Sequence, residues 1–158
     1  MSDPLIAAAI EILNVALVDM GTAIDGAPPG ALNWKPAGNE TNSMAVLATH
    51  ALGSTRSWIA CATGAPRPNR DRPSEFRATA AHVAELRAYI DTLGAECRAM
   101  LEAAAVPDWA VMRPTHVRPG GDMPTEVTAA WALMHGLEHL REHVGHVGLT
   151  RQVWDTRT

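Results

Sequence analysis

Histidines are concentrated near the C-terminal end of this sequence. Four of the seven lie in the segment 131–146, namely His135, His139, His143 and His146. Because an α-helix turns roughly 100° per residue, a helix here would hold all four imidazoles in one narrow stripe. Leucines and valines would fill the neighbouring arc, so the stripe would border the buried face. Imidazole nitrogens bind divalent metals, and the pattern therefore indicates a metal site inside a helical protein.

The strongest pair within this stripe is His139 and His143. Their i, i+4 spacing puts both side chains on one helix face, one turn apart, where they can bind the same ion. His50 lies in another predicted helix, on a face that also looks inward, and facing helices build the metal sites of helix bundles. Three neutral histidines leave open positions on a divalent ion, as in catalytic zinc sites. We therefore predict that His50, His139 and His143 bind a metal; Leu140 stands where an HExxH motif carries glutamate.

The residues around this pair have several open roles. His135 and His146 each lie within one turn of the pair, but four residues spread over three turns of one helix seldom reach one ion. Orientation of a ligand, contact with a substrate or simple burial is the favoured interpretation for both. Glu142 could orient an imidazole or act as a general base, although an exposed helix carboxylate is the simpler interpretation. Glu142 and His146 are the candidate catalytic residues.

Four helices are predicted to position these side chains, at about 3–25, 43–63, 74–104 and 124–154. Asp3 before a proline caps the first, Asn42 or Ser43 caps the second, and Ser74 caps the third. Apolar residues recur at steps of three and four within these segments, which is typical of helices that pack together. The sequence therefore predicts an all-α protein, with residues 1–158 forming a single domain folded as an antiparallel four-helix bundle.

Two tryptophan-bearing loops connect the predicted helices. Trp34 is expected to fold back over one end of the bundle. The proline- and glycine-rich segment 106–123 contains Trp109, Arg113, His116, Arg118, Gly120 and Gly121. Long irregular loops are often functional, so this segment is predicted to be a lid over one bundle end. Simple packing of Trp109 against the helices is an equal alternative.

Composition restricts the partners and the compartment. A net charge of −4 without a basic stripe argues against nucleic acid, and the short basic cluster Arg67–Arg72 is interpreted as a solvated loop. No apolar run is judged to approach the ~18–20 residues of a membrane span, and the N-terminus lacks the positive region of a secretory signal. Cys61 and Cys97 lack CxxC spacing and are interpreted as core thiols, which favours a reduced, cytoplasmic protein.

Two segments of the chain resemble the DinB/YfiT-like superfamily. His139-Leu-Arg-Glu-His143-Val-Gly-His146, with the residues that follow to Trp154, is similar to the last helix of that family. Residues 42–52, which contain the single histidine His50, are similar to its second helix. The resemblance implies a four-helix bundle, often a homodimer, with a divalent metal held by three histidines. Residue by residue, these are His50, His139 and His143.

The resemblance also indicates which reactions to expect. Characterised members of the family include transferases and isomerases that use low-molecular-weight thiols such as mycothiol or bacillithiol, and others are assigned as metal-dependent hydrolases. This sequence has His146 where glutamine is common. It has Gly145 where the sulfoxide-synthase relatives carry glutamate, which argues against iron-dependent sulfur–carbon chemistry.

The expected function is therefore a metal-dependent enzyme acting on a small molecule. It would be a thiol-dependent S-transferase or isomerase, or a hydrolase, using zinc or nickel and a low-molecular-weight thiol; imidazole also suits manganese and iron. The alternative is a non-catalytic protein that binds a metal or small ligand, such as a stress or sensor protein, because no convincing acid–base residue stands beside the histidines. A third interpretation is a helical dimer without metal, whose histidines line a polar pocket.

Overall fold

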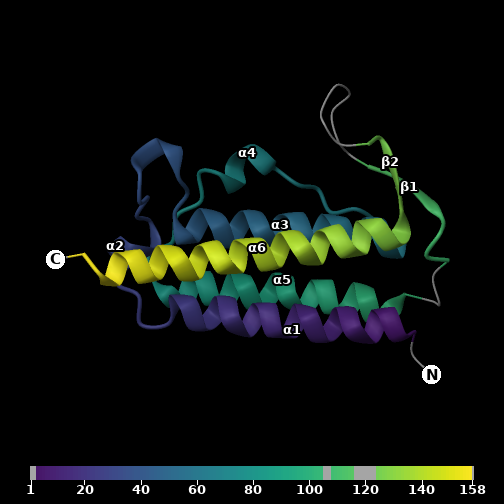
Figure 1. Cartoon of the computed structure of the whole chain (residues 1–158), viewed down its shortest axis with the longest axis horizontal. Coiled ribbons are helices and arrows are strands. Elements are labelled where there is room, and N and C mark those ends of the chain that lie inside the picture. Colours follow the sequence, from purple (N-terminus) through teal and green to yellow (C-terminus); the bar gives the residue numbers. More distant parts are fainter. Residues whose placement is uncertain (1–2, 105–107, 116–123, 158) are drawn as a thin grey trace.

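Four long helices form the framework of the protein. The computed structural model describes residues 3–104, 108–115 and 124–157 (Figure 1). The long helices are α1 (Pro4–Ile24), α3 (Met44–Thr63), α5 (Val83–Ala103) and α6 (Ala129–Asp155). The connections carry α2 (Pro29–Leu32), the 3-10 helix η1 (Gly38–Glu40), α4 (Arg72–Glu75) and strands β1 (Met112–Pro114) and β2 (Glu126–Thr128). The predicted all-α class is confirmed.

The long helices run in two opposite directions. Helix α1 is antiparallel to α5, and α3 is antiparallel to α6. Helices α3 and α5 run parallel, as the cross-helix contacts Tyr89–Thr49 and Glu96–Arg56 show by advancing together. The chain between α3 and α5 makes this possible, because it travels back along the bundle and carries α4 on its way (Figure 1). Strict up-and-down alternation therefore does not describe this bundle, although both antiparallel pairs are present.

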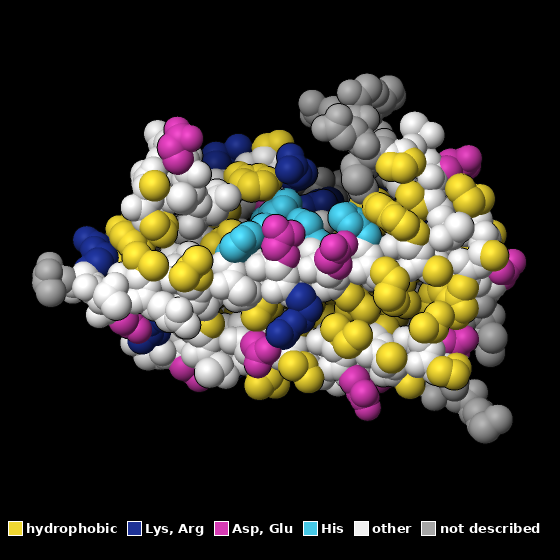
Figure 2. Space-filling model, viewed as in Figure 1, with side chains coloured by type: hydrophobic (Ala, Val, Ile, Leu, Met, Phe, Trp, Pro, Cys, Tyr) yellow, Lys and Arg dark blue, Asp and Glu magenta, His cyan; other side chains and the backbone are white. Residues whose placement is uncertain are grey.

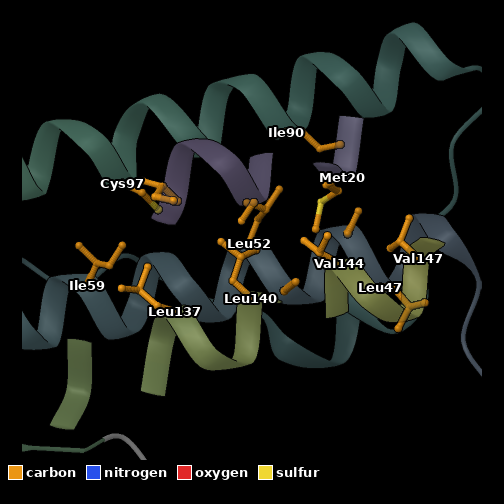
Figure 3. Packing of buried hydrophobic residues seen from close by; sticks show 14 of the residues in the cluster. Met20, Leu47, Leu52, Ile59, Ile90, Cys97, Leu137, Leu140, Val144 and Val147 are labelled. Atoms are coloured by element: carbon orange, nitrogen blue, oxygen red, sulfur yellow. The ribbon is translucent and has the colours of Figure 1, made fainter. Parts of the chain in front are cut away.

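The core lies between all four long helices. Apolar side chains from each of them meet in the interior (Figure 3). Leu13, Met20, Leu52, Ile59, Ile90 and Leu140 are among the fully buried residues. Burying one such side chain stabilises the fold by about 1.5–3 kcal/mol. Cys97 lies in the same core, as predicted, and burial raises the pKa of its thiol to about 12.

The third long helix begins later than the predicted 74–104. Helix α5 starts at Val83, and residues 72–75 form the separate short helix α4. The Asp71 side chain caps α4 by accepting a hydrogen bond from the backbone N–H of Ser74, so Ser74 is not the cap. The amide side chain of Asn33 pairs with both the N–H and the C=O of Ala80. These backbone groups are thus unavailable for a helix, and the chain stays irregular until α5 begins.

The fourth long helix also begins later than the predicted 124–154. Helix α6 starts at Ala129, where the Thr128 side chain caps it by accepting from the N–H of Trp131. The residues before it form strand β2, which pairs antiparallel with β1 in the register Met112↔Thr128. Each strand has three residues, too few for an alternating pattern to stand out in the sequence. The short ladder occupies the backbone groups that an earlier helix start would have used.

Helix α1 corrects the expectation about membrane-length segments. Its 21 residues include a window with a mean hydropathy of 1.7, so by length and composition the helix is able to cross a membrane. About 33% of that window is buried in this structure, where α1 packs against α5 and α6. Asn14 accepts hydrogen bonds from Arg98, and Asp19 pairs with Arg141 of α6. In the structure α1 is thus a bundle helix with polar contacts along its length.

Candidate metal centre

Three histidines from two helices meet at one point of the structure. His50 lies in the first half of α3, and His139 and His143 lie one turn apart on α6. Because α3 and α6 are antiparallel neighbours, these positions fall side by side. One nitrogen from each ring lies within 4.8 Å of the other two. The ring centroid of His50 lies 5.1 Å from the ring centroid of His139 and 5.3 Å from that of His143.

The donor atoms of this cluster fit a divalent ion. His50 is buried, and His139 and His143 are half-buried. Burial, together with the neighbouring histidines, lowers the pKa of His139 to about 3, and burial also lowers the pKa of His143. Both rings are therefore neutral at pH 7, the form that binds a metal. The Nδ1 atom of His139 is buried and has no hydrogen-bond partner among the described residues. A convergent set of three imidazoles with one unsatisfied nitrogen suits an ion held at about 2.0–2.1 Å from each ligand.

A partly buried ion pair contacts His50 at its Nδ1 atom. Glu75 of α4 is only 6% exposed, and its Oε2 lies 3.0 Å from Nδ1 of His50. Arg70 donates to both oxygens of this carboxylate, at 2.6 Å from Nε and 2.8 Å from Nη2. Burial acts to raise the pKa of Glu75, but the hydrogen bonds from His50 and Arg70 outweigh it and hold the pKa below its ordinary value. The carboxylate is thus ionised and held on both sides.

Histidine side chains reach the surface on one face of the molecule. Figure 2 shows them as a single patch over α6, at the edge of a hollow between this helix and the chain around α4. Lys or Arg side chains lie on the far side of the same hollow. The histidine patch therefore borders a surface hollow on this face.

The comparisons with known proteins agree with this architecture. Residues 15–154 match the sequence model of the DinB superfamily. The chain belongs to the DinB superfamily. A solved structure described as a conserved protein of locus from Enterococcus faecalis is similar, with a TM-score of 0.76 over 99% of each chain. Its sequence identity is 15%, so this likeness concerns the fold alone. No curated protein matches the chain.

Sequence reasoning missed Glu75 and Arg70 in this DinB chain. The sequence predicts Glu75 inside a long helix and Arg70 in a solvated loop. No local spacing connects either residue with His50, which precedes them by 25 and 20 residues. The solvated-loop interpretation is wrong for Arg67 as well, because its guanidinium donates to Sγ of Cys61 at 2.9 Å and to the carbonyl of Pro114. The buried state of Cys61 agrees with its predicted role as a core thiol.

His135 lies outside the cluster of three. Its ring stacks on Trp131, with centroids 4.7 Å apart, and meets the edge of Trp58 at 4.9 Å. The centroid of the nearest cluster member, His139, is 6.1 Å away. His135 is therefore part of an aromatic surface beside the centre; whether it contacts a substrate stays a prediction.

The two candidate catalytic residues are both exposed. His146 has its Nδ1 atom 3.3 Å from Nδ1 of His143, so it contacts the cluster at its solvent side. Glu142 lies on the exposed side of α6 next to His143, as the simpler interpretation expects. The catalytic roles of Glu142 and His146 stay predictions.

The predicted lid is only partly within the described residues. His116, Arg118, Gly120 and Gly121 lie outside them. Trp109 donates from Nε1 to Oδ2 of Asp3 at 3.1 Å, so it packs on the N-terminal end of α1. At the opposite end of the bundle, Trp34 contacts the ring edge of Trp154, with centroids 5.5 Å apart. Both tryptophans therefore close bundle ends by packing.

Proposed function

We propose that this DinB-superfamily protein is a metal-dependent enzyme acting on a small molecule. The reaction would be a thiol-dependent S-transfer or isomerisation, or a hydrolysis, at the His50–His139–His143 centre. One observation carries the proposal: three imidazoles converge within 4.8 Å and one of their buried nitrogens is left without a partner in the described structure. Such a donor set suits zinc or nickel and leaves positions for a thiol or water.

The chain contributes binding and orientation around this centre. A divalent ion held there would lower the pKa of a bound thiol or water and so supply a nucleophile at neutral pH. In this proposal His146, exposed beside His143, accepts the proton released from that nucleophile, and Glu142 is the second candidate for this role. The exposed ring of Trp131, backed by His135, offers an apolar surface for the substrate.

Elemental analysis of the tag-free protein beside His139→Ala tests the metal. We expect about one equivalent of metal in the parent and none in the variant, because a metal site loses most of its affinity for the ion when one of its protein ligands is removed. Removing the metal with a chelator should then abolish turnover in an assay that combines a low-molecular-weight thiol with an electrophile. Unchanged turnover after verified metal removal would contradict the proposal.

A second candidate is a non-catalytic protein that binds a metal or small ligand. It is favoured by the surroundings of the acidic residues near the cluster, because Glu75 is bound by Arg70 and Glu142 is exposed on α6. The buried carboxylate is therefore committed to an ion pair rather than to proton transfer. Metal-dependent thermal stabilisation without turnover of any thiol or ester substrate would support this function over the first.

We further propose that the protein is a cytoplasmic homodimer. The support for the dimer is a group of exposed apolar side chains on α1, Leu5, Ile12, Val15 and Val18. Figure 2 shows apolar side chains gathered where α1 lies beside α6, and such surfaces often bind a partner. Sedimentation velocity should give twice the chain mass, and Val18→Lys should lower it. The free thiols Cys61 and Cys97 support a reducing compartment.

A further inference from the structure

We propose that Glu75 is a positioning residue of the histidine centre. It holds the His50 ring with Nδ1–H toward the carboxylate, which leaves Nε2 as the nitrogen for the metal. Arg70 fixes Glu75, and Gly53 provides the space in which the carboxylate lies. This inference rests on the metal-dependent function proposed above and assigns a role to residues that bind no metal themselves.

The carboxylate of Glu75 has little freedom to move. Arg70 binds it through two nitrogens, Nε to Oε1 and Nη2 to Oε2, which is the paired geometry that orients a carboxylate most firmly. The Glu75 side chain is 8% exposed and that of Arg70 is 22% exposed, so water competes little with these bonds. The oxygen facing His50 is therefore fixed in direction as well as in distance.

The position of this oxygen decides the tautomer of His50. An ionised carboxylate only accepts hydrogen bonds, so the ring nitrogen 3.0 Å from Oε2 must carry the proton. Nη2 of Arg70 lies 3.3 Å from the same ring nitrogen, but a guanidinium only donates. Nδ1–H of His50 and Nη2–H of Arg70 therefore both donate to Oε2 of Glu75. A neutral imidazole protonated at Nδ1 has its lone pair at Nε2, and a carboxylate behind the ring makes that lone pair more basic.

Gly53 makes room for this arrangement. It lies on α3, three residues after His50, where the Glu75 side chain crosses the helix. A methyl group at this position would overlap with Oε1 of Glu75 and would lie 3.1 Å from its Cδ. Gly53→Ala therefore displaces the carboxylate while all three histidines, Glu75 and Arg70 are retained. By contrast, a methyl group at Gly148 of α6 would have nothing within 4 Å.

Zinc affinity, measured by competition with a chromogenic chelator, tests the inference in four proteins: the parent, Glu75→Gln, Gly53→Ala and the control Gly148→Ala. Loss of a group that orients a ligand weakens metal binding by about 10–100-fold. We expect losses in this range for Glu75→Gln and Gly53→Ala and an unchanged affinity for Gly148→Ala. The glycine variants gain the same methyl group within a helix, so their difference reports the displacement of Glu75.

The tautomer of His50 gives a second readout that needs no variant. Long-range proton–nitrogen NMR of the metal-free parent should show His50 protonated at Nδ1, and this preference should weaken in Glu75→Gln. If Glu75 only fastened the chain around α4 to α3, its variants would melt earlier but keep the parent's affinity and tautomer. Parent-like affinity in both variants, or protonation of His50 at Nε2, would overturn the inference. If the parent bound no zinc, the proposed metal-dependent function would be wrong. The tautomer of His50 in the metal-free parent would still show whether Glu75 positions this ring.

Discussion

At the residue scale, the three clustered histidines have different surroundings although their side chains are the same. His50 is buried and contacts the Arg70–Glu75 ion pair. His139 keeps a buried Nδ1 atom without a partner among the described residues. His143 touches the exposed His146. The His50 ring is thus held by an ion pair, the His139 ring has a nitrogen unpaired within the described structure, and the His143 ring lies toward solvent. This asymmetry would give a bound ion one protected side and one accessible side.

The thiol of Cys97 should be inert in the folded protein. It is fully buried, and burial raises its pKa to about 12 from an ordinary value of 9.0. The reactive thiolate is therefore absent from the folded state at pH 8, since a raised pKa keeps the proton bound. Iodoacetamide at pH 8, followed by mass spectrometry, should leave Cys97 unmodified until a denaturant is added. Rapid labelling of Cys97 without denaturant would contradict its place in the core.

The sign of this pKa shift also predicts how stability depends on pH. The folded state holds the Cys97 proton more tightly than the unfolded chain does. Its contribution to stability is complete below about pH 9 and declines as the pH rises toward 12, because only the unfolded state then releases the proton. Urea unfolding of the parent and Cys97→Ala across this range should show a steeper loss with pH in the parent. Equal slopes would mean that Cys97 does not titrate on unfolding.

At the scale of elements, the contact between α3 and α6 determines the geometry of the centre. Gly136 lies at this contact, where a methyl group would sit 2.9 Å from Cβ of Trp58. The hydroxyl of Thr55 donates across the helices to the carbonyl of Gly136 at 3.2 Å. The glycine therefore allows a close approach one turn before His139, and the spacing of the two helices sets the distance from His50 to its partners.

Gly136→Ala should separate these helices. Added volume in a packed contact costs about 1–3 kcal/mol, which exceeds the gain in helix propensity of up to about 1 kcal/mol. We expect a lower free energy of unfolding in urea and a weaker affinity for zinc, since His50 would lie farther from its partners. Gly145→Ala on the exposed face of α6, with nothing within 4 Å of the added methyl group, should leave the affinity unchanged. A variant as stable as the parent would show that the contact can adjust.

Sequence patterns predicted long elements better than short ones. The histidine stripe and its inward-facing partner followed from helical periodicity, because α3 and α6 are long and regular. The starts of α5 and α6 did not follow, since distant partners determine them: Asn33 binds the backbone of Ala80, and β1 pairs with β2. Glu75 was unpredictable for the same reason. Its role depends on where the segment between α3 and α5 places it, and no spacing between neighbouring residues in the sequence predicts that position.

At the scale of the whole molecule, the order of helix directions brings the ion pair to the centre. Helices α3 and α5 run parallel, so the chain between them must return along the bundle. This return passes over α3 and places α4 beside His50. Direct hairpin connections throughout would leave no segment in this position. The parallel pair therefore accounts for the carboxylate that contacts His50.

Metal binding should consequently stabilise the entire bundle. The ligands come from α3 and α6, so an ion bound to the folded state links two helices that separate on unfolding. A ligand at 100 times its dissociation constant contributes about 2.7 kcal/mol, which for a chain of this size corresponds to a rise in Tm of about 5–10 °C. Differential scanning calorimetry with added zinc should show this rise in the parent, with reversal by a chelator.

The same rise should be absent from His50→Ala and retained in His82→Ala. His50 supplies the only ligand that α3 contributes to the three-histidine cluster, whereas His82 is exposed at the start of α5. Without His50, an ion on His139 and His143 would bind to one helix alone and would no longer hold two together. A full rise in His50→Ala would mean that zinc binds along α6 only. The cross-helix centre would then be wrong, even if the protein bound one equivalent of metal.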